Sequence, residues 1–129
     1  MLEHKMQELK GTAPASNCYR TACYLLGVRP DITGKINRED MLAILATRFR
    51  KIRKSNRGTL IAFFAKPKQS KRRILFHTAV SLGGNLMFHQ QRTGAIINHS
   101  TVAHYIHSLG QGDIGYGLCT WTKHYYELK

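Results

Sequence analysis

Residues 74–90 read ILFHTAVSLGGNLMFHQ, and this stretch decides the fold. It consists of two short apolar runs, each with the length of a β-strand, on either side of Gly83-Gly84-Asn85, which is typical of a tight hairpin turn. We therefore predict a β-hairpin here. One histidine, His77, lies on the first strand and another, His89, on the second, so the hairpin is also the first place to look for chemistry.

The segments on either side of the hairpin extend this prediction to the whole chain. From the N-terminus the patterns predict a polar lead-in (1–16), a helix (18–26), a second helix (from an Asn37 cap through Ile52), a strand (59–64), a basic hairpin tip (66–73), strands at 74–82, 86–90 and 94–98, a brief helix (100–109), a glycine-rich turn (110–117) and a last strand (118–128). Helices come first and an antiparallel meander follows. This order predicts an α+β fold in which the helices pack on one face of the sheet.

Length and composition favour a single domain over 1–129. The chain has 129 residues, of which 43% are apolar, and this is enough to bury a core without metals or disulfides. No apolar run approaches a membrane span, so a soluble protein is expected. The N-terminal residues include acids and lack the apolar core of a secretory signal. We therefore expect a cytoplasmic protein or one exported by a specialised secretion system.

The three cysteines form neither a CxxC motif nor a metal-ligand spacing, and we expect all of them to be reduced. Cys18 falls in the first turn of the predicted helix that Asn17 caps. The free N–H groups and the positive dipole end at that position lower a thiol pKa, so Cys18 is the candidate nucleophile. Cys23 and Cys119 are most simply core residues.

A cysteine nucleophile needs a base and a third group that orients the base. His77 is the candidate base. Residues 41–112 contain no Asp or Glu, so the orienting group on a neighbouring strand must be neutral or a histidine. His89 is the natural candidate, and Gln90 and Asn98 are the alternatives.

These segments together resemble the NlpC-type papain-like cysteine peptidases, which are bacterial cell-wall hydrolases. That family has a catalytic Cys at a helix N-terminus, a Gly-led strand, a strand that begins with the catalytic His in an HVGIYLG-like segment, and a strand that ends in an IHA-like segment. The corresponding segments here read NCYR (17–20), GTLIAFF (58–64), HTAVSLG (77–83) and NLMFHQ (85–90). The resemblance spans about residues 16 to 100.

The resemblance implies a papain-like fold in which Cys18 is the nucleophile, His77 the general base and acid, and His89 the orienting residue. It implies hydrolysis of an amide bond in a peptide or a peptidoglycan stem, without a cofactor or a metal. Asn17 and Tyr19 stand where the family has Asp and Ser, and we expect them to line the substrate cleft or help to hold the oxyanion. Such a hydrolase fits an effector delivered by a specialised secretion system. Related branches of the superfamily are deamidases and acyltransferases, so such activity on a host protein or lipid is the alternative.

A formal charge of +13 suggests an anionic partner. Two basic runs carry much of this charge, and the candidate contact residues in them are Arg50, Arg53, Lys54, Lys71, Arg72 and Arg73. A nucleic acid, an anionic membrane surface or a wall polymer would fit, and a non-enzymatic binding module is the rival to the enzyme. No aromatic residues interleave with the runs, which argues against base stacking. The sequence sets no oligomeric state. The histidines at 99, 104 and 107 lack a Cys or an acid at metal-ligand spacing and favour a surface helix.

Overall fold

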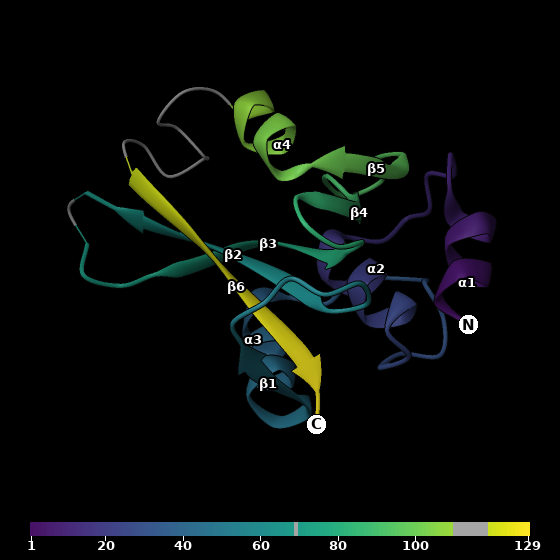
Figure 1. Ribbon diagram of the computed structural model, residues 1–129, viewed down its shortest axis with the longest axis horizontal. Helices are drawn as coiled ribbons and strands as arrows, with labels where there is room; N and C mark the ends of the chain where they lie inside the picture. Colours follow the sequence, from purple (N-terminus) through teal and green to yellow (C-terminus); the bar gives the residue numbers. More distant parts are fainter. Residues whose placement is uncertain (69, 110–118) are drawn as a thin grey trace.

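A computed structural model describes residues 1–68, 70–109 and 119–129 (Figure 1). In chain order, the helices and strands of this part of the chain are α1 (Leu2–Leu9), α2 (Cys18–Leu25), α3 (Arg38–Arg48), β1 (Phe49–Ile52), β2 (Leu60–Pro67), β3 (Ile74–Ser81), β4 (Leu86–Gln90), β5 (Ile97–Thr101), α4 (Val102–Ser108) and β6 (Cys119–Leu128). The α+β class is therefore confirmed. The turn expected at 110–117 lies outside the described residues. No helix within the described ranges is long and apolar enough to cross a membrane.

The six strands form one antiparallel sheet in the order β1-β6-β2-β3-β4-β5. Strands β2 to β5 form the predicted meander. The residue range predicted for the last strand, β6, is correct. In the sheet, β6 lies between β1 and β2. It pairs with β2 from Leu60 opposite Tyr126 to Pro67 opposite Cys119. A pairing between segments so far apart in the sequence leaves no local signal.

The second predicted helix is too long. It ends at Arg48, because Phe49 takes extended dihedral angles (φ −124°, ψ 160°) and begins β1, which pairs with the end of β6. Apolar side chains at Phe49 and Ile52 fit both a helical spacing and a strand end, and the distant partner strand decides between them. The predicted Asn37 cap is confirmed, since its side chain accepts from the N–H of Asp40 at 2.8 Å.

The other differences are shifts at element ends and one missed helix. The lead-in contains α1, which buries Met6 and Leu9. Strand β2 runs on to Pro67, into the segment predicted as a basic tip. Strand β5 begins three residues later than predicted, and α4 is capped by Thr101 rather than by Ser100.

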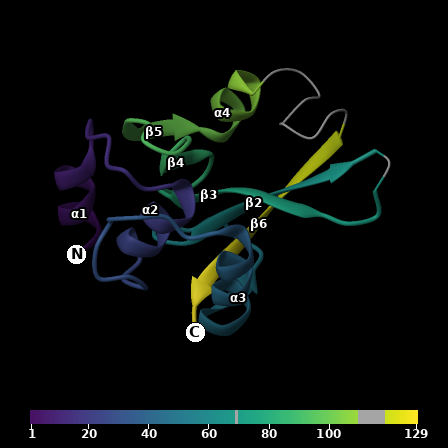
Figure 2. The same cartoon turned by 180° about the vertical axis from the view of Figure 1, so that it is seen from behind.

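Helices cover both faces of the sheet, which corrects the prediction that they all pack on one face. Successive residues of β2 belong to different clusters: Leu60 and Ala62 pack with α1, α2 and α3, whereas Ile61 and Phe63 pack with α4. Figures 1 and 2 show α3 and α4 on opposite sides of β2 and β3. The N-terminal helices do share one face, as predicted.

Candidate active site

The structure brings His77 and His89 together. Strands β3 and β4 pair only at Val80 opposite Phe88 and at Ser81 opposite Met87, so the two histidines lie beyond the end of the ladder. There His77 Nε2 lies 2.7 Å from His89 Nδ1, and the rings meet edge to face at 81°. The predicted base and its predicted orienting residue are thus hydrogen-bonded to each other.

A β-bulge aims His77 at this position. His77 pairs with Phe63, but the next pair joins Leu75 and Phe64, so Phe76 is the extra residue on β3. Bulges re-aim side chains and often occur beside active sites.

Both histidines are buried among aromatic rings. Only 1% of His77 and 6% of His89 is exposed. Tyr105 of α4 stacks on His77 with centroids 4.3 Å apart, and its ring meets His89 at 89°. Burial, together with the charge of His89, holds the pKa of His77 well below its usual value, and burial lowers the pKa of His89 to about 4. Both rings are therefore neutral at pH 7.

The remaining ring nitrogen of His77 is unused. Within the described part of the chain, Nδ1 of His77 is the one buried side-chain nitrogen or oxygen without a hydrogen-bond partner. The partner of one ring nitrogen fixes the role of the other. When His77 donates from Nε2 to His89, its Nδ1 carries a free lone pair and can accept a proton.

Cys18 lies beside the residue that follows His77. It is the first residue of α2 and is 9% exposed. The Thr78 hydroxyl donates to the Cys18 carbonyl at 3.1 Å. The Thr78 N–H and hydroxyl, and the N–H groups of Tyr19 and of Cys18 itself, also interact with the sulfur and favour the thiolate. Thr78 and His77 are successive strand residues and face opposite sides of β3, so Cys18 packs on the side of α1 to α3 while the His77 ring packs against α4. The structure therefore does not bring the predicted nucleophile and the predicted base into hydrogen-bond contact.

Burial nevertheless dominates at the sulfur. It raises the pKa of the Cys18 thiol to about 11, outweighing the nearby donors that lower it. The expectation of a lowered thiol pKa is therefore wrong, because a helix N-terminus in a dry environment does not compensate for the lost hydration of a thiolate. At rest the site holds a neutral thiol and a neutral imidazole.

Cys23 is a core residue, as predicted. It is fully buried, burial raises its pKa to about 11, and its sulfur lies 3.7 Å from that of Met41. Both Cys18 and Cys23 are free thiols. The side chain of Cys119 lies outside the described structure.

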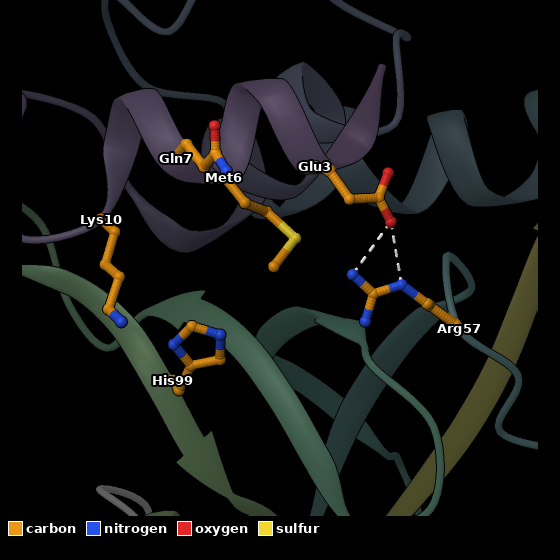
Figure 3. A pocket seen from close by; sticks show the side chains of 6 residues that line it. All are labelled: Glu3, Met6, Gln7, Lys10, Arg57 and His99. Carbon is orange, nitrogen blue, oxygen red and sulfur yellow. Dashed lines mark hydrogen bonds and ion pairs between the residues drawn. The ribbon is translucent and has the colours of Figure 1, made fainter.

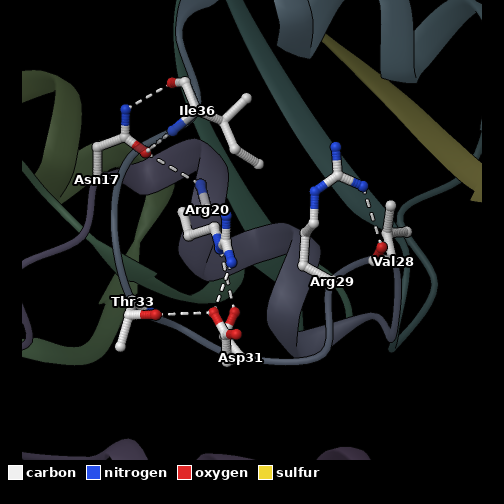
Figure 4. A network of polar contacts seen from close by, with 7 residues as sticks. All are labelled: Asn17, Arg20, Val28, Arg29, Asp31, Thr33 and Ile36. Atoms are coloured by element: carbon white, nitrogen blue, oxygen red, sulfur yellow. Dashed lines mark hydrogen bonds and ion pairs between the residues drawn. The ribbon is translucent and has the colours of Figure 1, made fainter.

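The residues that flank Cys18 in the sequence have structural contacts (Figure 4). The Asn17 side chain accepts from the N–H groups of Arg20 and Ile36, and its amide donates to the Ile36 carbonyl at 2.7 Å. Tyr19 is buried, and its hydroxyl donates to the Leu75 carbonyl at 3.1 Å. These contacts orient the start of α2.

Gln90 and Asn98, the alternatives to His89, do not meet His77 in a hydrogen bond. Gln90 is fully buried, and its amide donates to the carbonyls of Pro14 and Ala95 at 2.9 and 3.0 Å. Asn98 is exposed, and its side chain accepts from the N–H of the next residue.

Sequence reasoning missed Tyr105, which covers the histidine pair. Its signal was the pairing of Val102 and Tyr105, three residues apart on one face of the short helix. It also missed the structural role of Gln90. The one signal for that role was that Gln90 is a polar residue at the end of an otherwise apolar strand.

All six predicted anion-contact residues are exposed. Arg50 pairs with Glu127 at 2.7 Å, and Arg73 contacts His124 at 3.3 Å. The sheet also places aromatic rings near these cations, which the sequence did not suggest. Trp121 and Tyr125 lie at alternate positions of β6 with Lys123 between them, and Trp121 contacts Phe63 of the α4-covered face.

No family model, no curated protein and no solved structure matches the chain. Among the residues that the structure describes, no group of three His, Cys, Asp or Glu side chains is placed to hold a metal ion.

Proposed function

We propose that the chain is a papain-like cysteine hydrolase of the NlpC type that cleaves an amide bond in a peptide or a peptidoglycan stem. Cys18 is the nucleophile, His77 the base and His89 the residue that orients it. One observation carries the proposal: among the described residues, His77 Nδ1 is buried without a hydrogen-bond partner while His89 lies 2.7 Å from Nε2. A buried imidazole with one free nitrogen is costly unless a proton donor uses it.

The neutral resting state sets the order of proton transfer. The His77 ring lies on the α4 side of β3 and Cys18 on the other side, so the mechanism requires a shift of β3 or of the start of α2 that brings the two together. As the Cys18 sulfur then attacks the carbonyl carbon, the thiol proton moves to His77 Nδ1, and the imidazolium is stabilised through Nε2–H by His89. His77 then protonates the leaving amine, and water releases the acyl group from the sulfur. The backbone N–H groups of Cys18 and Tyr19 at the helix start can hold the oxyanion, and each such donor contributes about 3 kcal/mol.

The test is covalent trapping together with turnover. The protein is incubated with a p-nitrophenyl ester and with a panel of peptidoglycan stem peptides, and intact mass spectrometry locates any acyl adduct. Cys18→Ala should abolish adduct and turnover, and His77→Ala should lower turnover roughly 10²- to 10⁴-fold. Cys23→Ala and His124→Ala are matched controls and should retain activity. An adduct that persists in Cys18→Ala would contradict the proposal.

The deamidase and acyltransferase alternatives use the same three residues and differ in the substrate or the acceptor. Ammonia release from glutamine-containing proteins would indicate deamidation. Transfer of the acyl group to an added amine, in competition with water, would indicate an acyltransferase. Either result would keep Cys18 as the nucleophile and change the substrate class.

A second candidate function is the binding of single-stranded nucleic acid. Trp121 is 37% exposed and alternates with Lys123 and Tyr125 on β6, beside a β2–β3 hairpin that contains no acid. Aromatic stacking combined with cations is the usual basis of such binding. Affinity for an oligo-dT strand should fall steeply between 50 and 200 mM salt, and Trp121→Ala should weaken it. Equal binding to anionic vesicles by Trp121→Ala would instead indicate a membrane surface.

A further inference from the structure

A small cavity lies between α1 and β5, apart from the histidine pair. Its volume is about 250 Å³, and Figure 3 shows the six residues that line it: Glu3, Met6, Gln7, Lys10, Arg57 and His99. His99 belongs to β5, and its ring meets Phe88 of β4 edge to face, with centroids 5.1 Å apart. Because successive residues of a strand point to opposite faces, Phe88 and His89 face different sides of the sheet.

Two contacts fix α1 beside this cavity, one from the middle of the helix and one just after its last residue. The N–H of Gly11, just after the helix, donates to the Ile97 carbonyl of β5 at 2.9 Å. The Lys5 ammonium donates to the Tyr24 carbonyl of α2 at 2.8 Å. These contacts fix the helix beside the cavity, whereas the side chains of Lys10, Arg57 and His99 are exposed and open to solvent.

Cations outnumber acids in the cavity. Lys10, Arg57 and His99 face it, and Glu3 is the one acidic residue in its lining. A single oxygen of Glu3 accepts from Arg57 Nε at 3.0 Å and Nη2 at 2.9 Å. Among the described residues, Arg57 Nη1 and Lys10 Nζ form no hydrogen bond, so their N–H groups are available.

The two permanent cations, Lys10 and Arg57, also influence the His99 ring. Partial burial lowers the pKa of His99, and the charges of Lys10 and Arg57 lower it further. Lys10 reaches the cavity from the end of α1, and Glu3 reaches it from the first turn of the same helix. Arg57 comes from the segment between β1 and β2. On its other side, the His99 ring contacts the neutral ring of Phe88. An anion among these groups would relieve their repulsion.

We propose that this cavity binds a phosphate group, either as the free ion or as a phosphate monoester. Guanidinium, ammonium and imidazole N–H groups on three sides match the oxygens of a tetrahedral dianion. The cavity is smaller than those that enclose drug-sized ligands, which suits a single small group. The site is distinct from the proposed catalytic residues and does not depend on them.

The test follows the His99 ring by NMR during titration with sodium phosphate at constant ionic strength, with sodium chloride as the reference. Phosphate should shift the His99 signals in a saturable way and raise the His99 pKa. Glycerol phosphate distinguishes the sources: saturable binding of both probes indicates a site for phosphate groups in general, and binding of phosphate alone indicates the free ion.

Lys10→Gln should weaken phosphate binding at least about fivefold, because one of the two permanent cations in the cavity is lost. Lys51→Gln removes the same charge from an exposed position on β1 and should leave binding unchanged. Arg57→Gln, measured by calorimetry, should weaken binding as well. Shifts that stay linear with concentration and match those in chloride, or equal affinity in Lys10→Gln and the parent, would overturn the proposal.

Discussion

Gln90 and Ser16 share a buried hydrogen bond of 2.7 Å that joins the two halves of the candidate site. Gln90 directly follows His89 on β4, and Ser16 precedes Cys18 by two residues. The same Gln90 oxygen accepts from the Thr21 hydroxyl of α2, also at 2.7 Å. A single side chain therefore fixes the helix of the nucleophile against the strand of the orienting histidine.

Replacing Gln90 by leucine should destabilise the fold and lower turnover together. The hydroxyls of Ser16 and Thr21 would lose their shared acceptor inside the core and keep only their mutual contact of 3.2 Å, and an unsatisfied buried polar group costs roughly 1–3 kcal/mol. We expect the free energy of unfolding in urea to fall by about 2–4 kcal/mol. Gln91→Leu is the matched control, because Gln91 has one exposed bond to Ser108, and it should change stability by less than about 0.5 kcal/mol. Equal effects of the two changes would contradict this role of Gln90.

Acid should destabilise the protein through the histidine pair. Both folded-state pKa values lie below the unfolded value of about 6.5, so the unfolded chain binds more protons below that pH. Their contribution is complete above about pH 6.5 and is lost as the pH falls. With a pKa of about 4, His89 alone should cost about 2 kcal/mol at pH 5. Urea unfolding at pH 7 and pH 5 measures the loss.

The matched variants for this pH effect are His89→Gln and His104→Gln. The first removes a buried titrating ring and should flatten the pH dependence, whereas the second changes an exposed histidine and should leave it as in the parent. A parent protein equally stable at pH 5 and pH 7 would show that the pair is not held neutral by burial.

Local patterns predicted the elements that carry the site. The helix that Asn17 caps and the hairpin around the Gly83-Gly84 turn lie where the sequence put them, because caps, turns and strand alternation are encoded within a few residues. The pairing of β1 with β6 was not predictable in this way, since Phe49 becomes a strand residue only through a partner near the C-terminus.

For the site, the sequence correctly predicted the contact between His77 and His89, but neither the opposite faces of Cys18 and His77 nor the raised pKa of the thiol. The absence of acids in residues 41–112 indicated His89 as the partner of His77, and the two rings do meet. The expected thiolate rested on the helix N-terminus alone. Packing of α2 against β3 decides how far Cys18 is exposed to solvent. Helix α4 buries the two histidines on the opposite face of the sheet. Burial by distant segments sets these pKa values, and no local motif encodes it.

Alkylation of Cys18 should be slow at neutral pH and accelerate only above about pH 9. With a pKa of about 11 the thiolate fraction at pH 7 is about 300-fold below that of a free thiol of pKa about 8.5. Iodoacetamide labelling across pH 6 to 11, read by mass spectrometry at Cys18 and Cys23, measures both thiols in one sample. The urea-unfolded protein is the reference and should label fast. Rapid labelling of folded Cys18 at pH 6, lost in His77→Ala, would instead show a preformed thiolate-imidazolium pair.

Tyr105 should control the pKa of His77 as well as the stability of the α4 face. Its ring stacks on His77 and contacts Phe63 with centroids 5.5 Å apart, so Tyr105→Ala should cost about 3 kcal/mol of unfolding free energy and admit water to the imidazole. The pKa of His77, followed by NMR, should then rise toward 6.5, since desolvation is the main cause of its depression. Tyr105→Phe keeps the stacked ring and should keep the low pKa. If Tyr105→Ala lowers stability but leaves the His77 pKa unchanged, the prediction is wrong. Phe63 of β2, which also contacts the His77 ring, would then be the residue that excludes water from the imidazole.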